Sequence, residues 1–230
     1  MQAIIMAAGK GLRLQPLTNN KPKPLIEICG RPLLEYTLKA LPKAVDKVTI
    51  VIGYLGELIQ KYFGLQFNRL NLNYIQQGEI PGTAGALWSV KNEIKTEPFL
   101  VLNGDDIYSK EDLEQCVKHQ RALSVFPCQP AQLGSFDAVK VNNNHLVELY
   151  KPNQVELKQG VLLVIGAYVL DKRIFNYQPV QMLSGEYGLP HTIAAMAKDY
   201  PVTVTPANFW LPINSLEQLQ TAEQVLTAKG

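Results

Sequence analysis

A short apolar run near the start of the chain, Ala3-Ile4-Ile5-Met6-Ala7-Ala8, leads directly into Gly9-Lys10-Gly11-Leu12-Arg13. An apolar run of this length, ended by glycine, predicts a strand that is buried on both faces, as in a parallel sheet. Glycines at the carboxyl end of such a strand allow backbone N–H groups to approach an anion closely. Because open α/β sheets bind ligands at this end of their strands, the segment predicts a phosphate site there.

Two common phosphate-binding motifs do not match the glycine segment. A P-loop continues with Lys and Ser or Thr after its last glycine, whereas Leu12 follows Gly11. The dinucleotide fingerprint needs a third glycine at a spacing that is not met here. Taken alone, the glycines are equally consistent with a plain tight turn. The basic segments that follow, Pro22-Lys23-Pro24 and Gly30-Arg31-Pro32, favour a phosphate cradle instead.

The composition excludes several classes of protein. The chain has 230 residues, 47% of them hydrophobic, which predicts one sizeable domain. A net charge of +2 without a Lys/Arg run argues against nucleic-acid binding. Cys29, Cys116 and Cys128 are too widely spaced for a zinc site, and we expect reduced thiols and a cytoplasmic location. The sequence has neither an apolar stretch of membrane-spanning length nor a signal peptide, so we expect no membrane association.

Strand-like and helix-like segments alternate along the chain, which predicts a mostly parallel sheet with helices on both faces. The expected strands are 48–52, 72–75, 99–102 and 124–126, and the expected helices are 57–63, 83–94 and 110–120. A hairpin over 138–149, a strand over 162–170, a helix over 189–197, a strand over 202–204 and a helix over 216–228 follow.

With these motifs in order, the chain resembles the sugar-1-phosphate nucleotidylyltransferases, also called nucleotide-sugar pyrophosphorylases. The resemblance implies a Rossmann-like three-layer α/β/α sandwich with a mixed, mainly parallel sheet. It implies one domain over 1–230, with a nucleotide-binding half (1–130) and a sugar-phosphate-binding half (131–230), in a short form without the β-helix of some members. The implied reaction transfers NMP from an NTP to a sugar 1-phosphate with Mg²⁺ and releases pyrophosphate. The oligomeric state stays open, a homo-oligomer included.

The resemblance also implies roles for individual residues. Arg13 and Lys23 would act as catalytic cations on the phosphates, and the planar fork of arginine suits the leaving pyrophosphate. Asp105 would be catalytic by holding Mg²⁺, since a carboxylate suits this hard cation. The nucleotide would be bound by Ala8, Gly9, Gly11, Arg13, Gln77, Gly82 and Thr83, and the acceptor by Gly104, Lys151 and Glu186. Each position also has a structural alternative, such as a solvated surface cation, a glycine-rich helix start or a carboxylate that caps a helix.

The second half departs from the family pattern. Tyr150 stands where the family has a glutamate that binds sugar hydroxyls, and Asp137 stands where it has glycine. Pro212 replaces the aspartate of the Trp-x-Asp motif, the second metal ligand, and Asn214 is a neutral replacement two residues away. We expect Asp106 to cap a helix or face solvent. These departures leave a second hypothesis open, a catalytically weakened relative that binds a nucleotide or nucleotide sugar and regulates a partner.

Overall fold

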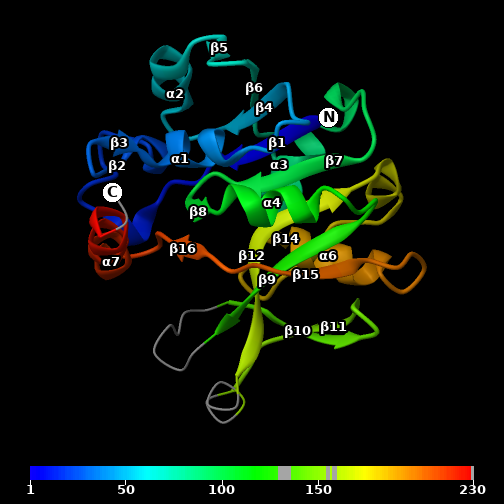
Figure 1. Ribbon diagram of the computed structural model, residues 1–230. Coiled ribbons are helices and arrows are strands. Elements are labelled where there is room, and N and C mark those ends of the chain that lie inside the picture. Colours follow the sequence, from blue (N-terminus) through cyan, green and yellow to red (C-terminus); the bar gives the residue numbers. More distant parts are fainter. Residues whose placement is uncertain (129–135, 154–155, 157–159, 229–230) are drawn as a thin grey trace.

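The computed structural model describes residues 1–230 except 129–135, 154–155, 157–159 and 229–230, and a mixed sheet forms its centre (Figure 1). Ten strands of the described residues lie in the order β10-β11-β15-β9-β12-β7-β1-β4-β6-β5. They are β1 (Gln2–Ala7), β4 (Lys47–Ile52), β5 (Gln66–Phe67), β6 (Leu70–Gln76), β7 (Phe99–Asn103), β9 (Ala122–Cys128), β10 (Ala138–Asn142), β11 (His145–Tyr150), β12 (Val161–Leu170) and β15 (Thr203–Pro206). Three small pairs lie outside this sheet: β2 (Glu27–Ile28) with β3 (Arg31–Pro32), β8 (Asp106–Tyr108) with β16 (Trp210–Pro212), and β13 (Val180–Gln181) with β14 (Tyr187–Gly188).

Helices cover both faces of the sheet, because five of the described helices present an apolar stripe to it, whereas α7 (Leu216–Thr227) packs against the small strands β2 and β16. The helices are α1 (Leu33–Ala40), α2 (Gly56–Phe63), α3 (Gly82–Ser89), α4 (Lys110–Cys116), α6 (Leu189–Met196) and α7 (Leu216–Thr227). Leu38 of α1, Ile59 of α2 and Leu113 of α4 belong to one buried cluster. Leu87 of α3 and Ile193 of α6 belong to another. The three-layer α/β/α architecture predicted above is therefore confirmed.

The parallel strands β7, β1, β4 and β6 form the part of the sheet that positions the candidate site. All six residues of β1 are buried, which explains why the strand is a continuous apolar run. Strand β12 lies antiparallel between β7 and β9, and β15 runs parallel to β9 on its other side. Because β1 and β7 are parallel neighbours, their carboxyl ends lie side by side and bring the loops after Ala7 and Asn103 together.

Most of the predicted elements are present, with some differences at their ends. The helix expected over 83–94 ends at Ser89 and is followed by a separate 3₁₀ turn, Lys91–Glu93. The helix expected over 110–120 ends at Cys116. Helix α1 was not predicted, although its buried Leu34 and Leu38 have helical spacing. No helix in the described ranges has both the length and the apolar character needed to cross a membrane.

Candidate functional site

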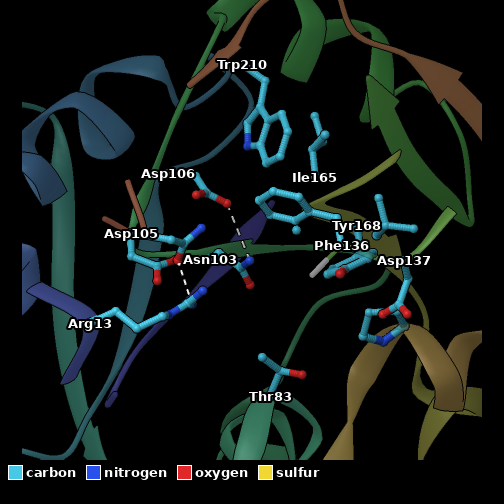
Figure 2. A pocket seen from close by; sticks show the side chains of 14 residues that line it. Arg13, Thr83, Asn103, Asp105, Asp106, Phe136, Asp137, Ile165, Tyr168 and Trp210 are labelled. Atoms are coloured by element: carbon cyan, nitrogen blue, oxygen red, sulfur yellow. Dashed lines mark hydrogen bonds between the residues drawn. The ribbon is translucent and has the colours of Figure 1, made fainter. Parts of the chain in front are cut away.

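Two cavities meet at the carboxyl edge of the parallel strands. The large cavity, about 980 Å³, is lined by the loop after β1, the start of α3 and the ends of neighbouring strands. The small cavity, about 250 Å³, lies beside β12 and β16 (Figure 2). Five residues line both cavities: Arg13, Thr83, Asn103, Asp105 and Asn214. The two cavities are therefore adjacent and share these five residues, and Arg13 and Asp105 converge at this edge of the sheet as the sequence predicts.

The loop after β1 forms one end of the large cavity, and Ala8, Gly9 and Gly11 all line it. Gly11 has a left-handed backbone (φ 64°), and a Cβ there would lie 3.0 Å from the Thr18 side chain and 3.1 Å from that of Lys23. Thr18 also fixes the loop, because its hydroxyl donates to the Gly11 carbonyl at 2.9 Å. Gly9, in contrast, has no heavy atom within 4 Å of an added Cβ. Packing therefore requires glycine at position 11 but not at position 9.

Arg13, Lys23, Asp105 and Asn214, which we call the junction cluster, lie where the cavities meet. The Lys23 ammonium donates to Asp105 Oδ2 at 2.6 Å and to Asn214 Oδ1 at 3.2 Å. Arg13 Nη2 donates to the same Asn214 oxygen at 3.0 Å. Lys23 is buried in the 3₁₀ turn Lys23–Leu25, whereas the Asp105 side chain is 35% exposed to the cleft. The cluster thus presents two cations and two oxygen ligands to one point.

The start of α3 closes another side of the large cavity. Gly82 has a positive φ of 89°, and a Cβ there would lie 2.6 Å from the Tyr187 carbonyl of β14. The Thr83 hydroxyl accepts a hydrogen bond from the Leu189 amide at 2.9 Å. Gln77 also lines the large cavity, and its side-chain amide donates to the carbonyls of Ile80 and Gly82 at 3.0 and 3.2 Å. These predicted nucleotide-binding residues therefore lie together on one wall.

The predicted acceptor residues are more dispersed. Gly104 packs tightly on β1, where its amide donates to the Met6 carbonyl at 2.9 Å and an added Cβ would lie 3.0 Å from that oxygen. Glu186 lines the large cavity and not the small one. Lys151 is exposed and lines neither cavity, but its ammonium lies 2.8 Å from Asp137 Oδ1, and Asp137 lines the small cavity. Lys151 thus lies at the rim.

Asp106 neither caps a helix nor faces solvent, so that expectation is wrong. It is 4% exposed and lines the small cavity, while Ser109 caps α4 by accepting from the Asp112 amide. Burial raises the pKa of the Asp106 carboxyl to about 7, the neighbouring Asp105 adds to the rise, and Lys23 opposes it. The only sequence signal for this residue is that two aspartates follow Gly104. Its burial depends on the pairing of β16 with β8, which lie more than a hundred residues apart in the chain.

Of the four residues that depart from the family pattern, Asp137 and Asn214 line the small cavity. Pro212 lies opposite Asp106 in the β8–β16 pair and lines neither cavity. Tyr150 also lines neither cavity and packs against the core instead. Asn214, in contrast, belongs to the junction cluster. An oxygen ligand therefore lies next to Asp105, and it comes from position 214 rather than position 212.

Comparison with known proteins gives related sequences over the whole chain. The chain is 33% identical over 233 residues to the bifunctional protein GlmU of Methanocaldococcus jannaschii, covering 100% of this chain and 55% of that protein. It is 38% identical over 122 residues to the UTP–glucose-1-phosphate uridylyltransferase AglF of Haloferax volcanii, covering 53% of this chain and 49% of that protein. The chain thus spans about half the length of these curated relatives.

Solved structures share the fold at low sequence identity. A UDP-glucose pyrophosphorylase in complex with UDP-glucose superposes with a TM-score of 0.84 at 20% identity, covering 100% of this chain and 99% of that one. An inositol-1-phosphate CTP transferase from T. maritima gives a TM-score of 0.78 at 21% identity, with 99% and 96% covered. A family model described as nucleotidyl transferase matches residues 2–228. The chain therefore belongs to the nucleotidyl transferase family.

Proposed function

We propose that the chain transfers NMP from an NTP to a sugar 1-phosphate, giving an NDP-sugar and pyrophosphate. The carrying observation is that three members of the junction cluster, Arg13, Asp105 and Asn214, line both cavities, and that the fourth, Lys23, lines the large one and binds two of them. The large cavity falls within the roughly 300–1,000 Å³ of typical small-molecule sites and would take the NTP, and the small cavity would take the acceptor. The names of the relatives, which act on glucose 1-phosphate and other sugar 1-phosphates, support this assignment.

In this reaction an oxygen of the acceptor phosphate attacks the α-phosphorus, and the bond from that phosphorus to the bridging oxygen of pyrophosphate breaks. Both substrates are anions, so positioning and charge neutralisation carry most of the catalysis. The Lys23 ammonium would exchange its contact with Asp105 for the phosphates, and Arg13 would stabilise the leaving pyrophosphate. A unit charge pair at about 4 Å is worth roughly 4 kcal/mol at an effective dielectric near 20.

The residues present fit Mg²⁺. A carboxylate oxygen of Asp105 and the amide oxygen of Asn214 lie around one cation, the Lys23 ammonium, and both are hard oxygen ligands. No group of three or more acidic, His or Cys side chains suited to a metal exists among the described residues, so substrate phosphates and water would complete the coordination. When bound, the metal would neutralise the phosphate charge.

The location and the domain division remain proposals. Cys29 and Cys116 are free thiols, which favours a reducing compartment, and we propose the cytoplasm. The nucleotide-binding half (1–130) and the acceptor half (131–230) each supply residues to the junction, since Asn214 comes from the second half and Arg13, Lys23 and Asp105 from the first.

The test is pyrophosphate release from the four common NTPs with a panel of sugar 1-phosphates and Mg²⁺. We expect release with at least one pair and a matching NDP-sugar by mass spectrometry. Lys23→Ala should abolish the activity, whereas Lys21→Ala, which removes an exposed lysine paired with Glu27, should keep it. Nucleotide binding without turnover for any acceptor would contradict the proposal and favour a regulatory binding protein.

A further inference from the structure

The small cavity contains a buried carboxylate that no cation pairs with in the described parts of the chain. Asp105 pairs with Lys23, and Asp137 pairs with Lys151 at 2.8 Å. Asp106 forms no such ion pair with a described residue, and its hydrogen bonds from Asn103 Nδ2 at 3.5 Å and from the Tyr108 hydroxyl at 3.4 Å are long, with the Trp210 indole as a further donor group beside it. Normal hydrogen bonds to oxygen are about 2.7–3.2 Å long, so the accepting capacity of Asp106 is largely unused.

A second polar group in the same cavity is also unused. Trp210 is 5% exposed and lines the cavity; its indole N–H lies close enough to the Asp106 carboxyl to lower the pKa of that group, but it forms no well-aligned hydrogen bond with a described residue. In Figure 2 its ring lies beside the Asp106 carboxyl, at the far side of the cavity from Arg13. Buried donors are normally paired, so an unpaired indole N–H beside an underused carboxylate indicates a missing ligand atom.

A hydroxyl group matches this pair of unused groups. It can donate its hydrogen to a carboxylate and accept a hydrogen bond from an N–H at the same oxygen. An ammonium group could satisfy only the carboxylate, because it cannot accept. The nearby rings of Phe136 and Tyr168 provide apolar surface. About 250 Å³ suits a single small ring rather than a nucleotide.

We propose that Asp106 is a specificity-determining residue that accepts a hydrogen bond from one hydroxyl of the acceptor sugar, while the Trp210 indole N–H donates to the same oxygen. The inference rests on the proposed function and refines its acceptor. The Asp106 carboxylate comes from β8, which pairs with the strand β16 that carries Trp210.

The test compares the best acceptor of the wild-type protein with its series of monodeoxy analogues. Because a hydrogen bond to a charged group is strong, removing the hydroxyl at one position should lower kcat/KM by about 10- to 100-fold. Removing a hydroxyl at any other position should lower kcat/KM much less. In Asp106→Ala this position-specific penalty should shrink to the several-fold part that the Trp210 N–H supplies. Trp210→Phe, which keeps the ring and removes the N–H, should reduce the same penalty several-fold.

Matched controls separate this role from a structural one. Asp137→Asn removes a different carboxylate that lines the small cavity, and any loss of activity should be the same for all deoxy analogues. In Asp106→Ala the KM for the NTP should stay within about twofold of wild type. If thermal unfolding shows that Asp106→Ala does not fold properly, Asp106→Asn, which keeps the side-chain volume, takes its place in the test.

Two outcomes would overturn the inference. One is a penalty at the same deoxy position that persists unchanged in both Asp106 variants, and the other is a wild-type protein that tolerates every deoxy analogue. Wild-type turnover in either case would leave the proposed function intact. Absence of turnover with every acceptor would remove both proposals together.

Discussion

Among the described residues, five glycines line the large cavity (Gly9, Gly11, Gly53, Gly78 and Gly82), whereas the small cavity has one lining glycine, three aromatic side chains and the buried Asp106. A glycine loop can bind phosphate in any nucleotide, since its N–H groups contact atoms that all nucleotides share. Side chains that converge from several strands instead depend on the particular ligand. The cavity proposed for the nucleotide therefore follows the family pattern, while the cavity proposed for the acceptor carries what is individual to this chain.

The largest expected effect belongs to the junction between the two regions. Arg13→Ala should lower kcat by about 10²–10³-fold, because its charge would act on the leaving pyrophosphate in the transition state. Steady-state kinetics measure this, and the KM for the NTP should change much less than kcat. An increase in KM with no change in kcat would mean that Arg13 binds the substrate and the transition state equally, and would contradict its proposed role on the leaving pyrophosphate.

Asn214→Ala tests whether the second half completes the metal site. Loss of the amide oxygen should raise the Mg²⁺ concentration for half-maximal rate by about tenfold, as is typical for weakened ligand sets. Pro212→Asp provides the comparison, because position 212 lines neither cavity and lies opposite the buried Asp106. Its carboxylate should lower stability and leave the Mg²⁺ requirement unchanged. A lower Mg²⁺ requirement in Pro212→Asp would mean that position 212 does reach the metal.

Paired glycine variants test the backbone character of the large cavity. Gly11→Ala should cost about 2 kcal/mol of stability, from its positive φ and its close neighbours, and lower Tm by about 4–8 °C. Gly9→Ala should leave Tm within about 1 °C, because nothing lies near its Cβ. Differential scanning calorimetry gives both values. Equal Tm shifts for the two variants would show that the loop geometry described here is wrong.

Asp106→Asn should make the folded protein more stable than wild type at alkaline pH, and this gain should shrink at acid pH. The folded-state pKa of Asp106 is raised from 3.8 to about 7, so the folded protein binds more protons than the unfolded chain between these values. Stability therefore falls as pH rises through this window, and removing the titrating group should remove that loss. The Tm difference between variant and wild type should be larger at pH 8 than at pH 5. A Tm difference that does not change with pH would contradict the raised pKa of the buried Asp106 carboxyl.

The same contrast explains what could be predicted from the sequence. Strand β1 and the convergence of Arg13 with Asp105 depend on short motifs that follow apolar strands, so local pattern was enough to predict them. The burial of Asp106 was missed because it depends on a long-range pairing with β16. Asn214 appeared displaced from the family aspartate when counted along the chain, but the turn after β16 brings its oxygen to Lys23 at 3.2 Å. Packing between distant segments decided these positions.

The most direct test of the account is a crystal structure of the protein with its NDP-sugar product. We predict the base and ribose in the large cavity beside Gln77 and Thr83, the diphosphate at the junction cluster, and the sugar in the small cavity with one hydroxyl on Asp106. A sugar ring bound outside the small cavity, or a diphosphate distant from Arg13 and Lys23, would contradict the account.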